Sequence, residues 1–240
     1  MITYDCDPAL VQSHLPADCV PDLVDGRARC SLVAFDFKDA RVFGRHWPRH
    51  VHFPEVNLRF YVTRGGVRGV SFLSEFVPRL AIAWIARAIY NEPYAAVAMR
   101  SESRRDGDTL TIAHRLRVGR RWQTIRVSGR GPAVVPDAGT DLAADADWIK
   151  EHRWGFGQTR AGKPLTYEVT HPKWAIYADT TADLAFDFGH VYGPTWAFLN
   201  EATPVSVLLA AGSEVSVSPR KIVGTTARTA ETVLAESVTA

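Results

Sequence analysis

The sequence predicts an α+β protein that is mainly β, built on a curved antiparallel sheet with a few flanking helices. Residues 55–62, EVNLRFYV, alternate strictly between polar and apolar side chains, as the two faces of a strand do. Residues 109–118 and 122–129 alternate in the same way around a short GRR turn, and long hairpins of this kind curve readily into a barrel. The chain has 240 residues, of which 46% are hydrophobic and 22% charged, so it can bury the core of one large domain.

The first 53 residues predict two elements and raise the question of a metal site. We expect a short helix over residues 8–14 and a strand over residues 28–37. His50 and His52 would share one strand face, a spacing at which two imidazoles bind a metal if a third ligand such as Glu55 converges. Glu55 has the opposite parity and would face away. The sequence therefore favours a loop or strand edge at the mouth of a cavity, and we expect no metal.

The strand over residues 55–62 carries the main candidate site. The apolar face consists of Val56, Leu58, Phe60 and Val62. The polar face consists of Glu55, Asn57, Arg59 and Tyr61. An acid, an amide, a guanidinium and a phenol in register are unlike the exterior of a strand that is buried on one side only, so this polar face predicts the wall of a cavity. Gly65 and Gly66 then turn the chain into an antiparallel partner strand that carries Glu75.

A helix is expected over residues 78–90, because Pro78 suits a first helical turn. This segment is apolar nearly all round and should be buried. Arg87 is the charge that falls within the apolar surface, and a buried guanidinium needs a partner. The acids nearest in the sequence are Glu55 and Glu75. Pro93 ends the helix, and residues 94–99 predict the next strand.

These segments resemble a known family. FPEVNLRFYV, RGVSFLSEF and ARAIYNEPYAAVAM, preceded by HLPADCVPDLVDGRARCSLVAFDF, are similar to the YqjF-like (DUF2071-type) family of uncharacterised conserved bacterial proteins. That family is similar in turn to acetoacetate decarboxylases, so the resemblance implies a curved antiparallel sheet that closes into a cone-like barrel around a small cavity. Decarboxylases of this type carry an arginine and then, after a proline, two lysines, the first of which forms a Schiff base. Arg87 and Pro93 match, but Tyr94 and Ala95 stand at the lysine positions.

The missing lysines bear directly on the chemistry. A Schiff base needs a primary amine whose pKa is lowered by desolvation or by a neighbouring cation. The chain has five lysines, and none of them lies between residues 55 and 99; they are Lys38, Lys150, Lys163, Lys173 and Lys221. Lys173, in HPKWAIY, is the one alternative nucleophile, although an exposed lysine at the start of a strand is the favoured interpretation. The sequence therefore argues against Schiff-base decarboxylation and leaves open whether the protein is an enzyme.

The second half of the chain is expected to complete the sheet. We expect a surface loop over residues 101–108, a helix from Thr140 or Asp141 to about Arg153, and then a glycine-rich turn, GFGQTRAGK. His114 belongs to an apolar strand face, which favours a histidine satisfied in the core over a catalytic base. The last third should form a meander of strands, which are PLTYEVTHP, KWAIYADT, LAFDFGHVYG, PVSVLLAAG and SEVSVSP.

Composition bounds the partners and the compartment. The formal charge is +2, from 28 basic and 26 acidic residues that are scattered along the chain, so neither nucleic acid nor a membrane surface is indicated. The cysteines, Cys6, Cys19 and Cys30, have no metal-ligand spacing, and without a signal peptide they fit a reduced cytoplasmic protein. We expect one domain over residues 1–223 and a frayed tail over residues 224–240, with no cofactor.

Three functional classes follow from the candidate site. The first is binding of a small polar or anionic organic molecule, including a carboxylate, in the cavity, by Glu55, Asn57, Arg59, Tyr61, Glu75, Arg87 and Tyr94. The second is a non-covalent acid–base enzyme that acts on a keto acid or another enolisable compound. The third is a buried ion network that only fixes the strand register, with function elsewhere, such as in a homo-oligomer. Fold analogy alone does not decide among them.

Overall fold

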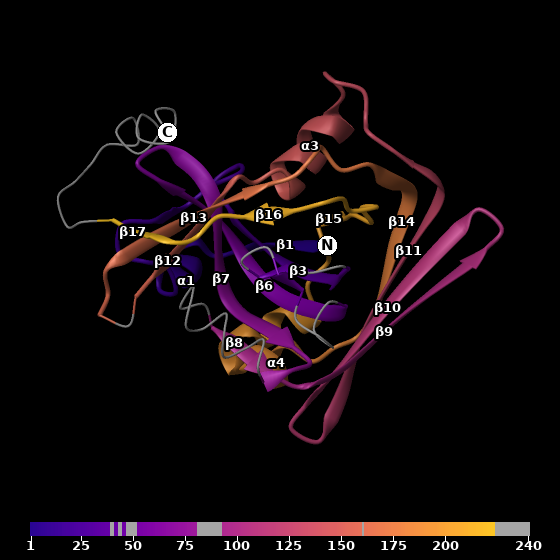
Figure 1. Ribbon diagram of the computed structural model, residues 1–240, viewed down its shortest axis with the longest axis horizontal. Helices are drawn as coiled ribbons and strands as arrows, with labels where there is room; N and C mark the ends of the chain where they lie inside the picture. Colours follow the sequence, from indigo (N-terminus) through magenta and orange to yellow (C-terminus); the bar gives the residue numbers. More distant parts are fainter. Residues whose placement is uncertain (39–40, 43–44, 47–51, 81–92, 160, 224–240) are drawn as a thin grey trace.

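The computed structural model describes residues 1–38, 41–42, 45–46, 52–80, 93–159 and 161–223 (Figure 1). Within these residues the protein is mainly β, with short helices at the periphery, as the sequence predicts. The described strands form an 11-stranded sheet, a 4-stranded sheet and a small ribbon of β4 (Arg41–Val42) and β5 (Arg45–His46). The predicted tail, residues 224–240, and most of the helix predicted over residues 78–90 lie outside the described residues.

The larger sheet contains the strand on which the candidate site was predicted. Its main path runs in the order β15, β1, β3, β6, β7, β12, β13 and β16, and β2, β8 and β17 pair with its members. The bounds are β1 Ile2–Cys6, β2 Val20–Pro21, β3 Ala28–Phe37, β6 Phe53–Arg64, β7 Val67–Val77, β8 Tyr94–Ala96, β12 Trp154–Gln158, β13 Pro164–Thr170, β15 Ser206–Val207, β16 Ser216–Val217 and β17 Lys221–Ile222. The predicted strand over residues 28–37 and the hairpin at Gly65 and Gly66 are confirmed. Both glycines have positive φ, 56° and 82°, as a tight hairpin turn of this hand requires.

The smaller sheet forms a curved wall of long strands beside the larger one (Figure 1), and the two sheets share one hydrophobic core cluster. Its order is β14, β11, β10 and β9, with bounds Ile176–Ala185, Arg121–Val134, Thr109–Val118 and Ala98–Asp106. The predicted hairpin of β10 and β11 is confirmed. The surface loop predicted over residues 101–108 was wrong, because residues 101–106 belong to β9. All of these residues are exposed, so the alternation of apolar and polar side chains that marks a half-buried strand is missing.

The helices within the described residues are short and lie beside the sheets. They are α1 (Pro8–Gln12), α3 (Asp141–Lys150), α4 (Phe188–Tyr192) and a 3-10 helix, η1 (Pro194–Asn200). The predicted N-cap of α3 is confirmed, since Thr140 Oγ1 accepts a hydrogen bond of 3.2 Å from the Ala143 amide. In the described part of the chain, no helix is long and apolar enough to cross a membrane.

Other predicted elements differ from the structure in whole or in part. The strand expected over LAFDFGHVYG gives way to α4, because Asp187 caps a helix by accepting a hydrogen bond of 3.0 Å from the His190 amide. The expected turn GFGQTRAGK begins with strand β12, whose two glycines hide the strand pattern. Of the segments PVSVLLAAG and SEVSVSP, only two-residue strands form, and β1 was not predicted at all.

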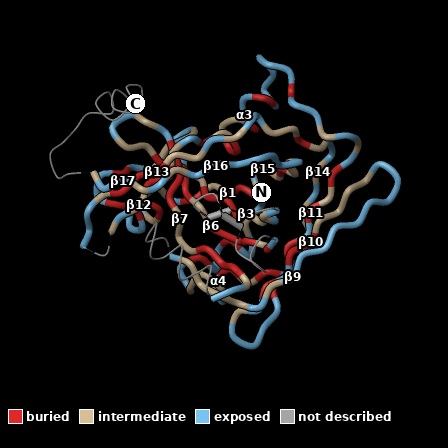
Figure 2. The backbone as a smooth tube through the Cα atoms, in the orientation of Figure 1, coloured by how far each residue is buried: buried red, intermediate tan, exposed pale blue. Residues whose placement is uncertain are grey.

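The core lies mainly on the apolar face of β6. Val56, Leu58, Phe60 and Val62 are fully buried there, in one cluster with residues of β1, β3 and η1 (Figure 2). The opposite face of β6 is also covered, because Tyr61 packs in a second cluster with Val70 of β7 and Ile149 of α3. The predicted division of this strand into an apolar and a polar face is therefore confirmed, but neither face is open to solvent.

Candidate functional site

The polar face of β6 is divided into two halves by an irregularity in the β6–β7 pairing. The register shifts between Leu58 and Arg59, so that Asn57 pairs with Glu75 while Arg59 pairs with Phe72. Glu55 and Asn57 lie before this shift, and Arg59 and Tyr61 lie after it. Because the unpaired residue, Leu73, belongs to β7, the two halves stay on one face of β6 but lie against different parts of β7.

The half before the shift gathers two carboxyl groups. Glu55, Asn57 and Glu75 are each only 3% exposed. Asn57 Nδ2 donates a hydrogen bond of 3.0 Å to Glu55 Oε1, and the Tyr94 hydroxyl donates one of 3.1 Å to Glu55 Oε2. Tyr94 reaches this position because β8 runs parallel to β7 and pairs Tyr94 with Glu75. We call Glu55, Asn57, Glu75 and Tyr94 the carboxyl pair site.

Burial sets the protonation of this site. Burial raises the pKa of Glu55 to about 7, and the hydrogen bonds with Asn57, Tyr94 and Glu75 offset part of that rise. Burial also raises the pKa of Tyr94 well above its usual range, as do the charges of Glu55 and Glu75. Tyr94 thus remains a neutral donor, while Glu55 changes charge near neutral pH. A carboxyl group of this kind can both give and take a proton.

Tyr167 of β13 is a neighbour of this site that the sequence did not single out. Its electrostatic effect contributes to the raised pKa of Tyr94. The aromatic ring occupies the space above Gly155 of β12, where an added Cβ would lie 2.2 Å from Tyr167 Cζ. Since the sequence predicted a turn at Gly155, the strand pairing that places Tyr167 there could not be anticipated.

Arg59 and Tyr61, in the half after the shift, have structural contacts. Arg59 Nη2 donates a hydrogen bond of 2.6 Å to the carbonyl of Ile149, at the end of α3, and its guanidinium lies 5.4 Å from the centre of the Tyr61 ring. The Tyr61 hydroxyl lies 2.5 Å from Ser31 Oγ. Among the described residues, Arg59 forms no ion pair with Glu55 or Glu75. Its predicted role in binding a ligand carboxylate stays a prediction.

The positive charge of Arg59 also acts on its neighbours. Burial and then Arg59 lower the pKa of the Met1 amino group to about 5. Burial, Arg59 and Arg68 lower the pKa of His152 to about 3, against the opposing effect of its hydrogen bond with the Trp148 carbonyl. The cation is therefore surrounded by groups that stay neutral at pH 7, and its closest acceptor is a backbone oxygen.

Two other predicted residues cannot be placed. Arg87 and His50 lie outside the described residues, so the contacts predicted for them stay predictions. His52 is exposed.

His114 is buried, as its place on an apolar strand face predicted, and its Nε2 lies 3.6 Å from Asp36 Oδ2. It borders a cavity of about 30 Å³ between the two sheets, which is otherwise lined by apolar residues such as Leu32 and Ile125.

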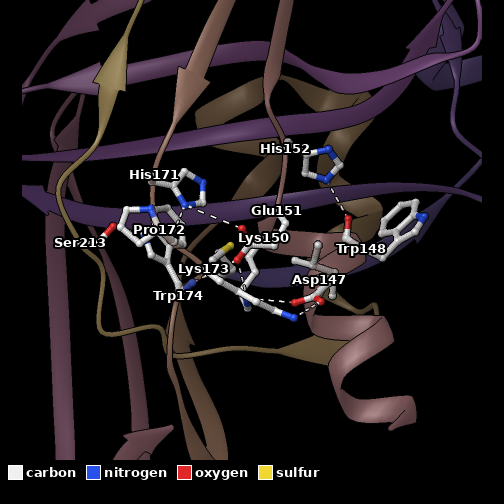
Figure 3. A network of polar contacts seen from close by, with 12 residues as sticks. Asp147, Trp148, Lys150, Glu151, His152, His171, Pro172, Lys173, Trp174 and Ser213 are labelled. Carbon is white, nitrogen blue, oxygen red and sulfur yellow. Dashed lines mark hydrogen bonds and ion pairs between the residues drawn. The ribbon is translucent and has the colours of Figure 1, made fainter. Parts of the chain in front are cut away.

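A second polar cluster, which the sequence did not predict, lies at the end of α3 (Figure 3). Lys150 has a fully buried side chain, and its Nζ lies 3.1 Å from Asp147 Oδ1 and 2.5 Å from Glu151 Oε1. Lys173 Nζ lies 2.5 Å from the other oxygen of Asp147. His171 stacks on Trp174 and approaches Glu151. We call Asp147, Lys150, Glu151, His171 and Lys173 the lysine network.

The lysine network joins α3 to the segment between β13 and β14. The backbone amide of Trp174 donates a hydrogen bond of 3.2 Å to Glu151 Oε1. Burial raises the pKa of Asp147, but the hydrogen bonds from Lys173 and Lys150 outweigh it and hold that pKa below its usual value. Two lysines face two carboxylates, so the charges balance. The predicted exposed position of Lys173 is confirmed only in part, since its side chain is 38% exposed and ion-paired.

Comparisons with known proteins agree with the fold. A family model, DUF2071, described as an uncharacterised conserved protein, matches residues 1–214. No curated protein matches the sequence. An acetoacetate decarboxylase from Legionella pneumophila is 16% identical, with a TM-score of 0.54, over 93% of this chain and 83% of its own.

Two further solved structures share the fold. An acetoacetate decarboxylase-like enzyme from Sphingomonas wittichii is 17% identical, with a TM-score of 0.55, over 91% of this chain and 86% of its own. The enduracididine biosynthesis enzyme MppR, complexed with pyruvate, is 12% identical, with a TM-score of 0.51, over 90% and 80%. At these identities the likeness establishes the fold alone.

Proposed function

We propose that this chain, which belongs to the DUF2071 family of uncharacterised conserved proteins, binds a small polar organic molecule at the carboxyl pair site. One observation carries the proposal: Glu55 is buried, hydrogen-bonded by two neutral donors, and has a pKa raised to about 7. Among the described residues no arginine or lysine forms an ion pair with it. A carboxyl group that is only partly ionised can donate to or accept from a hydroxyl, carbonyl or amine of a ligand.

The fold supports a ligand of this class. MppR, a structural neighbour, was solved in complex with pyruvate, a small keto acid. We propose the same size and polarity of ligand here, held against the polar face of β6 by Glu55, Asn57 and Tyr94. Tyr94 stands at the Schiff-base position in the resemblance, and its hydroxyl supplies a hydrogen bond rather than an amine. Binding is therefore non-covalent in this proposal.

An anionic ligand would need a cation at the site. Arg59 is bound to the Ile149 carbonyl, on the other side of the register shift. Recognition of a carboxylate would therefore rest on Arg87. Pyruvate and hydroxyacetone share the keto group, but hydroxyacetone has no carboxylate. Comparing them separates binding of a neutral polar ligand from binding of an anionic ligand through Arg87.

A thermal-shift measurement tests the binding. Pyruvate and hydroxyacetone are added to wild type, Glu55→Gln and Glu168→Gln at pH 7. Glu168 forms a surface ion pair with Arg153, so it controls for the substitution itself. We expect at least one compound to stabilise wild type and Glu168→Gln, by about 2.7 kcal/mol at a hundredfold excess over its dissociation constant, and to leave folded Glu55→Gln unshifted. Equal shifts in all three proteins, or none in wild type, would leave the carboxyl pair site as a structural network only.

The raised pKa of Glu55 favours a second candidate, an acid–base enzyme on the same ligand. Its carboxylate would take a proton from the carbon next to the keto group and return it, while the Tyr94 hydroxyl stabilises the enolate. The test is exchange of the methyl protons of pyruvate in D₂O, followed by NMR. We expect Glu55→Gln to slow the exchange by at least about a hundredfold, while Glu168→Gln keeps the wild-type rate. Exchange no faster than without protein would exclude turnover of this kind and leave the binding proposal intact.

A further inference from the structure

Strand β9 forms one edge of the four-stranded sheet. It pairs with β10 along its whole length, from Ala98 to Asp106, with no register shift. No other described strand pairs with it. Apart from Met99, every residue of β9 is exposed, and the strand follows the outer side of the molecule (Figures 1 and 2). Such an edge presents a row of backbone N–H and C=O groups to which another strand can bind.

The outward face of β9 carries charges of alternating sign. Residues two apart share a face of a strand, and here they are Arg100, Glu102, Arg104 and Asp106. When a second β9 is aligned antiparallel about Ser103, Arg100 lies opposite Asp106, and Glu102 lies opposite Arg104. The two-fold symmetry repeats both pairs. Every charge on this face would then meet its opposite, and opposite charges at paired positions stabilise a sheet.

We propose that β9 pairs with β9 of a second copy of this chain in this register, joining two four-stranded sheets into one across a two-fold axis. Closed two-fold dimers and added strands at sheet edges are both common ways in which chains associate. On the other face of β9, Ser103 meets Ser103 and Ser101 meets Arg105. No like charges lie directly opposite each other on either face.

A charged edge strand usually prevents association, so the alternating signs matter. Protected edges carry charged side chains, above all lysines, or prolines and bulges. β9 has no proline, and its pairing with β10 is regular throughout. Charges that alternate would repel a copy in the wrong register and attract one in the register centred on Ser103. The pattern therefore selects one partner alignment rather than excluding all of them.

A second observation comes from Arg100. It lies directly opposite Arg115 in the β9–β10 register, and both guanidinium groups lie near the half-exposed ring of Trp122, at 5.7 and 5.4 Å from its centre. Like charges directly opposite destabilise a sheet. Neither arginine forms an ion pair with a carboxylate among the described residues. In the proposed dimer, Asp106 of the second copy would lie beside Arg100 and relieve this repulsion.

The test uses charge reversal in the full-length chain. Glu102→Arg and Arg104→Glu each place two like-charge pairs in the dimer, whereas the exchange of both residues in one chain restores the opposite pairs. Arg117→Glu is the matched control, because it makes the same charge reversal on the same face, on the inner strand β10. Sedimentation equilibrium measures the dimer dissociation constant, and circular dichroism confirms that each variant is folded.

We expect wild type, Arg117→Glu and the doubly exchanged variant to dimerise, and each single variant at β9 to dissociate at least about tenfold more readily. An equimolar mixture of the two single variants should dimerise again, because Glu102→Arg in one copy then faces Arg104→Glu in the other. This recovery separates a lost interface from a misfolded chain. Two results would overturn the proposal. One is a wild type that stays monomeric at 200 µM, about a thousandfold above a submicromolar dissociation constant. The other is that the single variants dimerise like wild type.

Discussion

The carboxyl pair site and the lysine network are both clusters of ionisable groups, but the pKa of a carboxyl group is shifted in opposite directions in the two. In the lysine network, two ammonium groups face two carboxylates at 2.5–3.1 Å, and the pKa of Asp147 is held low. In the carboxyl pair site, the donors to Glu55 among the described residues are neutral, and burial raises the pKa of Glu55 to about 7. A balanced cluster keeps its protons fixed and suits a structural role. A cluster of like groups has a proton that can be exchanged.

The largest effect is expected from Lys150→Met in the lysine network. The substitution keeps most of the buried side-chain volume and removes the charge, leaving Asp147 and Glu151 with less compensation. Loss of one partner from a buried pair destabilises strongly, and we expect about 3 kcal/mol here because the two acids are partly exposed. Urea denaturation at pH 7 measures the loss. Lys163→Met, at a surface turn, is the control, and an equal effect of the two would show that the lysine network contributes no stability.

Glu55→Gln, in the carboxyl pair site, should raise the free energy of unfolding at pH 8 rather than lower it. The folded state holds a proton on Glu55 up to a pKa of about 7, whereas the unfolded chain loses it near 4.5. Unfolding therefore releases a proton between these values, so the free energy of unfolding of wild type falls as pH rises through this window. We expect this contribution to be about 2 kcal/mol between pH 5 and pH 8.

The measurement is urea denaturation of wild type, Glu55→Gln and Glu168→Gln at pH 5 and pH 8. Glutamine has no proton to lose, so Glu55→Gln should be the more stable protein at pH 8, and the difference from wild type should shrink at pH 5. Because His152 and the amino terminus have lowered pKa values in the folded state, they take up protons on unfolding in this range, so only the difference between variants isolates Glu55. The same difference at both pH values would contradict the raised pKa and remove the contrast between the two clusters.

The sequence predicted the residues of the carboxyl pair site and missed the lysine network, and both outcomes have physical reasons. Strict alternation on β6 and the hairpin at Gly65 and Gly66 were enough to place Glu55, Asn57 and Glu75 near one another, because strand parity and register are local properties. The lysine network depends on the packing of α3 against the segment before β14. Lys150 and Lys173 are 23 residues apart, and nothing in the sequence indicates that they share Asp147.

Two regions show the limit of alternation as a signal. Alternation places Arg59 on the face of β6 that carries Glu55, but it does not show that α3 covers this part of the face and gives Arg59 a different set of contacts. It also failed on β9, whose exposed residues are polar on both faces. Irregular pairing and strands without a buried face are decided by the rest of the sheet, so only the structure places them.

The smallest effect is expected from Tyr94→Phe, and it sharpens the comparison most. The Tyr94 hydroxyl donates to the ionised form of Glu55, so its loss should raise the pKa of Glu55 further and cost about 1 kcal/mol at pH 8. At pH 5, where Glu55 is protonated, the cost should be smaller. Tyr177→Phe removes a hydroxyl that accepts a hydrogen bond from Arg105 at the surface, and it should show no such dependence on pH. A pH-independent loss in Tyr94→Phe would mean that Tyr94 only fills space beside the carboxyl pair and does not control the proton on Glu55.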